Sequence, residues 1–148
     1  MRRHERGQIL TFFAVGLLVI VGFVGLAVDG SRLFQAHLAA QVLADEAASA
    51  ASQRVNSGPD SALRNGQPPE LIDGQEAGSA YDAADSYLAA RVTKRSTTWA
   101  IQVQPREVAV IVKRDVEMAF LQVLGFSTQT VEAEGFATPV SGIVGPGQ

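Results

Sequence analysis

An uncharged apolar stretch near the N-terminus constrains this sequence more than any other feature. Residues 9–28 read ILTFFAVGLLVIVGFVGLAV and contain no charged side chain. At a rise of about 1.5 Å per residue, a helix of this length is about 30 Å long, which matches the hydrocarbon core of a bilayer. The alternative is a buried helix of a soluble protein, but such helices rarely extend this far without a polar face. We therefore expect residues 9–28 to form a transmembrane helix.

Basic residues are concentrated on one side of this helix. Arg2, Arg3 and Arg6 precede the apolar stretch, whereas Asp29 follows it directly. Because cytoplasmic flanks of membrane helices are enriched in Lys and Arg, this asymmetry predicts that the N-terminus is cytoplasmic. With one apolar stretch, we expect a single-pass protein of the cell membrane. Residues 1–8 are then a cytoplasmic tail, and everything after the span is extracytoplasmic.

Two kinds of proteolytic processing compete with an uncleaved anchor. Gly25-Leu26-Ala27 has the small-x-small pattern of a signal-peptidase site, although the apolar stretch is longer than the 7–15 residues or so of a typical signal peptide. Cleavage of the prepilin type after Gly7 is disfavoured, because Phe12 stands where the usual acceptor carries Glu. Sequence alone leaves the processing of the N-terminus open.

The helical pattern continues beyond the apolar stretch, so we expect an exported stalk helix over residues 29–55. Small residues recur at spacings of three and four, and alanine is the strongest helix former. A face of small side chains buries little area itself but allows a neighbouring helix to approach closely. The residues expected on this helix-packing face are Gly22, Gly25, Asp29, Ala36, Ala40, Ala47 and Ala50.

The rest of the chain predicts a loop, a second helix and a small sheet. Gly and Pro pairs mark residues 56–75 as a loop, and Asp73 with Glu76 resembles a capping box that opens the second helix. This helix has an apolar face formed by Tyr81, Ala84, Leu88 and Val92.

Alternation of apolar and polar residues predicts a strand over residues 97–104, a second strand with Val108, Val110 and Val112 on one face, and a third strand over residues 127–138. The short connection over residues 104–107 predicts an antiparallel hairpin between the first two strands. Trp99 lies on the apolar face of the first strand, where we expect it in the core, and Asp115 is placed to cap a short helix over residues 116–124. The fold class is therefore α+β: a long N-terminal transmembrane and stalk helix, then a small helix-plus-sheet domain over residues 76–138. The sheet is three-stranded, antiparallel or mixed, as in a pilin, and residues 139–148 form a flexible tail.

The sequence offers little chemistry. It has no cysteine, its two histidines (His4 and His37) are far apart, and it contains no Walker A, GxGxxG or GxSxG motif. The formal net charge of −3 does not favour nucleic-acid binding. We expect no enzymatic activity, no cofactor, no metal site and no small-molecule substrate.

Three segments resemble the TadE/TadG-like proteins of Flp (tight adherence) pilus systems. Arg6-Gly7-Gln8 precedes the apolar stretch, GLAVDGSRLF spans residues 25–34, and QVLADEAASAA spans residues 41–51. The chain departs from the family pattern at Val42-Leu43, Glu46 and Ser49. The matching motif positions are Gly7, Gln8, Asp29, Gly30, Arg32, Gln41, Asp45, Ala47 and Ala48.

The resemblance implies a bacterial, membrane-anchored accessory protein or minor pilin that assembles with other small subunits outside the membrane. Longer TadG-like members carry additional exported domains, so a short TadE-like subunit is expected here. The resemblance supplies no catalytic role for Asp29 or Asp45, and we expect these side chains to fix the register against a partner helix. The expected partners are pilin-like subunits and the inner-membrane platform. The alternative function is a membrane-tethered extracytoplasmic binding or sensor module.

Overall fold

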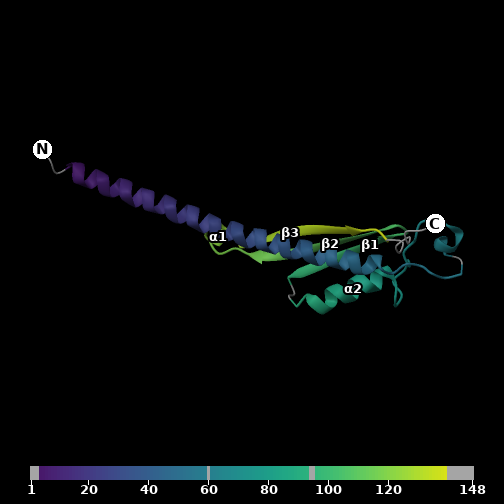
Figure 1. Ribbon diagram of the computed structural model, residues 1–148. Coiled ribbons are helices and arrows are strands. Elements are labelled where there is room, and N and C mark those ends of the chain that lie inside the picture. Colours follow the sequence, from purple (N-terminus) through teal and green to yellow (C-terminus); the bar gives the residue numbers. More distant parts are fainter. Residues whose placement is uncertain (1–3, 60, 94–95, 140–148) are drawn as a thin grey trace. The chain divides into compact units, whose positions relative to one another are not determined.

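The computed structural model describes residues 4–59, 61–93 and 96–139 (Figure 1). Two compact units make up the chain. The helix–loop unit comprises Met1–Gln35 and Val116–Gln129, and the sheet unit comprises Ala36–Asp115 and Thr130–Gln148. In chain order the elements are α1 (His4–Ser52), the 3₁₀ helix η1 (Ala62–Asn65), α2 (Ala80–Arg91), β1 (Thr97–Gln104), β2 (Glu107–Glu117), the 3₁₀ helix η2 (Leu121–Leu124) and β3 (Thr128–Ala137). The α+β prediction is confirmed.

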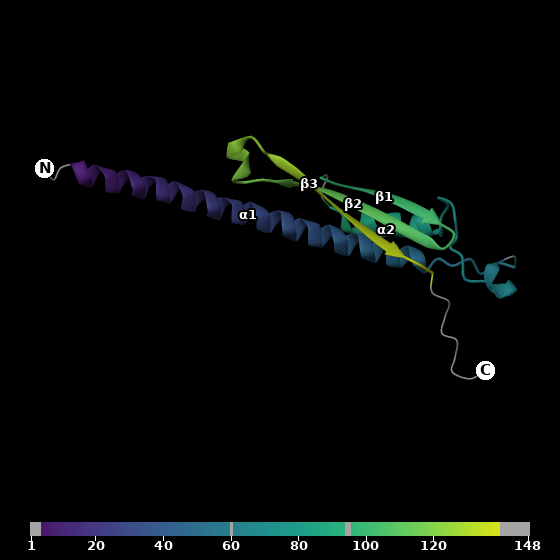
Figure 2. The same cartoon turned by 90° about the horizontal axis from the view of Figure 1, so that it is seen from above.

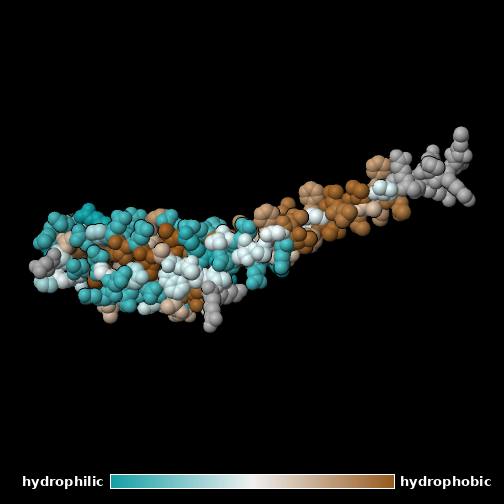
Figure 3. Space-filling model, turned by 180° about the vertical axis from the view of Figure 1, so that it is seen from behind, coloured by the Kyte–Doolittle hydropathy of each residue, from teal (hydrophilic) through white to brown (hydrophobic). Residues whose placement is uncertain are grey.

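Helix α1 contains both the apolar stretch and the expected stalk. It starts at His4, within the expected tail, and ends at Ser52, three residues before the expected end. Its apolar part is long enough and apolar enough to cross a membrane, and only 6% of the most apolar window is buried (brown in Figure 3). Large apolar side chains such as Leu18 and Phe23 are more than two-thirds exposed. In water this surface would be strongly unfavourable, which is consistent with a membrane anchor.

The sheet has the strand order β1-β2-β3 and is antiparallel. Strands β1 and β2 form a hairpin in which Gln104 pairs with Glu107 and Trp99 pairs with Val112. As predicted, Pro105 ends the first strand, because proline has no N–H to donate to the ladder. Val108, Val110 and Val112 are completely buried and form the apolar face of β2.

Helix α2 and the C-terminal part of α1 run along the sheet (Figure 2). The core of the sheet unit is formed by the side chains that these helices and the valine face of β2 bury against one another. Small residues let α1 approach the sheet closely. A Cβ built on Gly135 of β3 would lie 2.4 Å from the backbone carbon of Ala44, so only glycine fits there. On α2, Ala84 and Leu88 are completely buried, as their spacing predicted. The core is therefore built largely from alanine and valine.

The predicted start of α2 was wrong. Helix α2 begins at Ala80, and its N-cap is Ser79, whose hydroxyl accepts a hydrogen bond from the Asp82 N–H at 3.1 Å. Asp73 instead accepts a hydrogen bond from the N–H of Gly74, its own neighbour. Gly74 and Gly78 have φ of +97° and +87°, and this left-handed conformation cannot belong to a right-handed helix.

The predicted helix over residues 116–124 was also wrong. Strand β2 continues through Glu117, and only Leu121–Leu124 forms a 3₁₀ turn, which ends at Gly125 with φ of +95°. The carboxylate of Asp115 does not cap a helix but accepts a hydrogen bond from the Thr130 hydroxyl of the adjacent strand. Apart from Pro139, the expected tail over residues 139–148 lies outside the described residues.

Candidate functional site

Asp29 forms the centre of the helix–loop unit. It is the first charged residue after the apolar stretch, and its side chain is completely buried. Its carboxylate accepts three backbone hydrogen bonds from the loop between β2 and β3, from Ala119 at 2.9 Å, Phe120 at 2.8 Å and Leu121 at 2.7 Å. We call residues 118–127 the apolar loop. The carboxylate thus fastens this loop to α1 through consecutive N–H groups.

These hydrogen bonds favour the ionised carboxylate. The N–H of Leu121 makes the largest contribution to lowering the pKa of Asp29, while burial acts in the opposite direction. The N–H groups of Ala119 and Phe120 and the charge of Arg32 also lower the pKa. A buried carboxylate is tolerated only where its oxygens have such partners, so the loop and the acid depend on each other.

Gly25 lies one helical turn before Asp29 and makes the second contact with the apolar loop. A Cβ built on Gly25 would lie 2.0 to 2.5 Å from ring atoms of Phe120, so the ring occupies the space that any other side chain would need. At Gly22 the corresponding space is open. Gly22, Gly25 and Asp29 were expected to share a face near the end of the span. Gly25 and Asp29 contact the apolar loop of the same chain, and Gly22 is exposed.

The remaining residues of the expected helix-packing face lie in the sheet unit. Ala36, Ala40 and Ala47 are buried in that unit, and Ala50 is half-buried. The partner that packs against Ala40 and Ala47 in this structure is the core formed by α2 and the sheet. A regular spacing of small residues predicts that another element packs closely against the helix. It does not indicate whether that element belongs to the same chain or to another protein.

The motif residues after the span also make contacts inside the sheet unit. The Gln41 side-chain amide donates to the Asp45 carboxylate at 3.0 Å and to the Glu134 backbone carbonyl of β3 at 2.9 Å. Ala48, like Ala47, is completely buried. Gly30 has open space where a side chain would be, and Arg32 is exposed. For Gly7 and Gln8 the structure describes only the course of the α1 backbone.

Sequence reasoning missed two polar contacts that tie α2 to its neighbours. The Tyr87 hydroxyl donates to the Glu46 carboxylate of α1, and this hydrogen bond is the main reason why the pKa of Tyr87 is raised. Half-buried Trp99 packs against the core as expected, and its indole N–H donates to Asp85 at 2.9 Å. The sequence pattern places Glu46 and Asp85 on helix surfaces. Nothing in their local sequence distinguished them from carboxylates that face the solvent.

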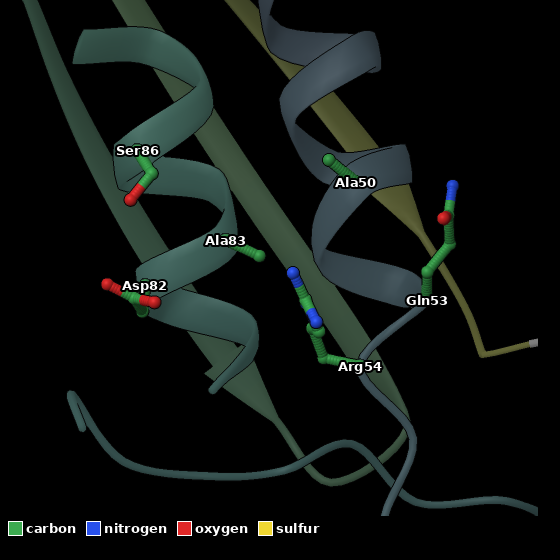
Figure 4. A pocket seen from close by; sticks show the side chains of 6 residues that line it. All are labelled: Ala50, Gln53, Arg54, Asp82, Ala83 and Ser86. Carbon is green, nitrogen blue, oxygen red and sulfur yellow. The ribbon is translucent and has the colours of Figure 1, made fainter. Parts of the chain in front are cut away.

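The described part of the sheet unit contains a surface groove. It is lined by Ala50, Gln53, Arg54, Asp82, Ala83 and Ser86 (Figure 4). The Asp82 carboxylate already accepts a hydrogen bond from the Gly78 N–H near the start of α2. Within the described ranges, no three His, Cys, Asp or Glu side chains are grouped as metal ligands would be.

Comparison with known proteins gives a match for the N-terminal segment. A family model described as "Putative Flp pilus-assembly TadE/G-like" matches residues 7–54. We call residues 7–54 the TadE/G-like segment, because they are similar to that family. No curated protein and no solved structure matched the chain.

The TadE/G-like segment covers α1 almost completely and ends two residues after it. It includes both residues that hold the apolar loop, Gly25 and Asp29. The resemblance inferred from the sequence is thus confirmed over residues 7–54. The structure adds what Asp29 does in this chain, which is to bind three backbone N–H groups of the apolar loop.

Proposed function

We propose that this protein is a single-pass, membrane-anchored component of a bacterial Flp-type pilus, acting as an assembly factor or minor pilin-like subunit without catalysis. The observation that carries the proposal is the coincidence of two features in α1. Residues 7–54 match the TadE/G-like family, and the same helix presents an exposed apolar surface long enough to cross a bilayer. A helix of this kind anchors the chain, and the sheet unit is then available for contacts with other subunits.

The orientation in this proposal follows from the flanking charges. Arg2, Arg3 and Arg6 favour a cytoplasmic N-terminus, so that Asp29 and the rest of the chain are on the extracytoplasmic side. This is also the side on which a surface pilus is assembled.

Subunit contact requires a surface that is not already used inside the chain. On α1, Leu38 and Val42 lie one helical turn apart in the sheet unit and are 48% and 54% exposed. Apolar side chains that share an exposed helix face beside buried alanines are typical of a helix that packs against two neighbours. We assign the partner contact to this outward pair, because Ala40 and Ala47 are covered by the chain's own core.

The test is complementation of a strain that lacks the gene. Wild type should restore surface pili and cell adherence, and Leu38→Glu combined with Val42→Glu should remain in the membrane but lose co-purification with other pilus subunits. The matched control is His37→Glu with Gln53→Glu, which adds the same charge to exposed polar positions of the same region. Full pilus assembly in the deletion strain would contradict the proposed function. Full co-purification by the Leu38/Val42 variant would contradict only the assigned surface.

A further inference from the structure

The apolar loop exposes more hydrophobic surface than its own contacts explain. Residues 118–127 read MAFLQVLGFS and contain no charged side chain. Val123 is 85% exposed, Leu124 73% and Phe126 56%. Large apolar side chains gathered at the tip of one loop are an unfavourable surface in water and are typical of a site that is covered by something apolar.

The contacts inside the helix–loop unit place this loop at the end of the apolar stretch. Phe120 lies over Gly25, which precedes the last residue of that stretch by three positions, or about 5 Å of helix. The Asp29 carboxylate, the first charged group beyond the stretch, holds the N–H groups of the three residues that start the tip. If residues 9–28 cross the bilayer, the loop therefore lies at the depth of the headgroup and acyl boundary.

The backbone of the loop is also suited to such a place. Backbone polar groups in or near lipid must find partners within the protein, since little water is available to them. The N–H of Val123 donates to Phe120, that of Gly125 to Gln122, and that of Phe126 to Leu121. Gly125, in the left-handed conformation, closes this turn, and the Met118 N–H donates to Ser127 at the base of the loop.

We propose that the apolar loop inserts into the outer leaflet of the membrane and forms a second membrane contact beside the transmembrane helix. The inserted side chains are those of Val123, Leu124 and Phe126, and the depth is that of interfacial segments, about 5–10 Å into the boundary region. Asp29 acts as the fastening point, because its carboxylate binds the loop backbone where the helix leaves the bilayer. This inference rests on the proposed membrane anchoring and adds a lipid-binding surface to it.

Continuity with the transmembrane helix selects lipid as the occupant. The Phe120 ring packs on Gly25 of the apolar stretch, and the exposed side chains of Val123, Leu124 and Phe126 follow Phe120 in the same loop. A lipid leaflet beside that helix meets the tip without any further partner. A neighbouring protein subunit is the competing occupant, and the experiment below distinguishes the two.

The test uses the natural absence of cysteine, which makes single-site spin labelling possible in the full chain. Nitroxides are attached to Val123→Cys in the loop, Val19→Cys in the apolar stretch and Leu63→Cys, an exposed apolar position on η1. Each purified protein is reconstituted into phosphatidylcholine vesicles without other pilus proteins. Collision of the label with lipid-soluble oxygen and with a water-soluble nickel chelate is then measured.

We expect the label at Val123 to follow the label at Val19, with severalfold fewer collisions with the nickel chelate than the label at Leu63. Adding Asp29→Asn should raise the nickel accessibility of the Val123 label, because the loop loses its fastening. Equal accessibility of the labels at Val123 and Leu63, with Val19 in lipid, would overturn the loop proposal and leave the anchor intact. Protection of Val123 only in native membranes that contain other pilus subunits would likewise overturn it and assign the loop to a protein contact. A water-exposed label at Val19 would overturn the anchor as well.

Discussion

Replacing Gly135 with alanine tests how closely α1 packs against the sheet. In the structure the new methyl group would lie 2.4 Å from the Ala44 carbonyl carbon and 2.5 Å from the Asp45 nitrogen. Ordinary contacts between carbon atoms are about 3.5–4.0 Å, so β3 and the helix must separate locally by about 1 Å. Both atoms belong to the helix backbone, so no side-chain rotation can relieve the clash.

A separation of this size has a large effect because dispersion is short-ranged. A gap of 0.5–1 Å or so removes about a quarter to a half of the attraction between the facing atoms, and overpacking typically costs about 1–3 kcal/mol. We expect Gly135→Ala to lower the free energy of unfolding by about 2–3 kcal/mol. For a domain of about 60–100 residues, each kcal/mol lowers Tm by about 4–8 °C, so a decrease of at least 8 °C or so is expected.

The assay is thermal unfolding of the full chain in detergent, followed by near-UV circular dichroism of the single tryptophan, Trp99, which packs against the same core. Gly30→Ala is the matched control, because the same methyl group there lies within α1 and meets no atom within 4 Å apart from its chain neighbours and the adjacent backbone of its own helix. It should be neutral or slightly stabilising, since alanine is favoured over glycine in helices by about 1 kcal/mol. Equal melting temperatures for Gly135→Ala and wild type would refute the close approach of α1 and β3.

Two further predictions concern Asp29, and a third concerns the buried alanine face of α1. Asp29→Asn replaces an acceptor oxygen by an amide donor that faces backbone N–H groups, so proteolysis within the apolar loop should become faster while the sheet unit melts unchanged. Because the pKa of Asp29 is lowered in the folded chain, the contribution of its carboxylate to stability is complete above its ordinary pKa of 3.8 and is lost as the pH falls through the lowered pKa. A spin label at Val123 should therefore become more mobile only in that acidic range. Mobility that increases between pH 8 and 6 would contradict this sign. Ala40→Leu places a larger side chain at a completely buried position and should destabilise the sheet unit by about 1–3 kcal/mol, measured as a decrease in Tm. An unchanged Tm with reduced partner binding would instead place Ala40 in a subunit interface.

Much of the fold could be predicted because its main signals are long or strictly periodic. The apolar stretch and the alanine-rich continuation predicted α1 to within a few residues at either end, and the alternation over residues 97–104 gave both bounds of β1. Strand β2 was recognised from its three valines, but a helix was expected from residue 116, where β2 still continues. Such patterns reflect burial over many residues, which a single local preference does not override.

The errors concern residues whose local preferences fit two structures. Asp73 and Asp115 have side chains that can accept hydrogen bonds at a helix start, but the same acceptors serve a turn and a cross-strand pair here. The φ values of Gly74 and Gly78 explain the later start of α2, and these two glycines were the available signal.

Asp29 and the apolar loop could not be connected from the sequence. Ninety positions separate Asp29 from Ala119, and no local pattern relates a carboxylate to backbone N–H groups so distant along the chain. The unbroken uncharged stretch over residues 118–127 was the signal that this loop is unusual, but the spacing of its apolar residues also allowed a short helix. The alanine face was recognised as a close-packing surface, whereas which partner covers it depends on tertiary structure.

Cysteine accessibility measures the central claim, an N-terminal anchor with the sheet unit outside the membrane, most directly. His4→Cys and Gln67→Cys, each introduced into the cysteine-free chain, are treated in spheroplasts of the native host with a membrane-impermeant maleimide. We predict that both proteins sediment with membranes, that Gln67→Cys is labelled in intact spheroplasts, and that His4→Cys is labelled only after lysis. Labelling of His4→Cys before lysis with protection of Gln67→Cys, or recovery of either protein in the soluble fraction, would contradict the account.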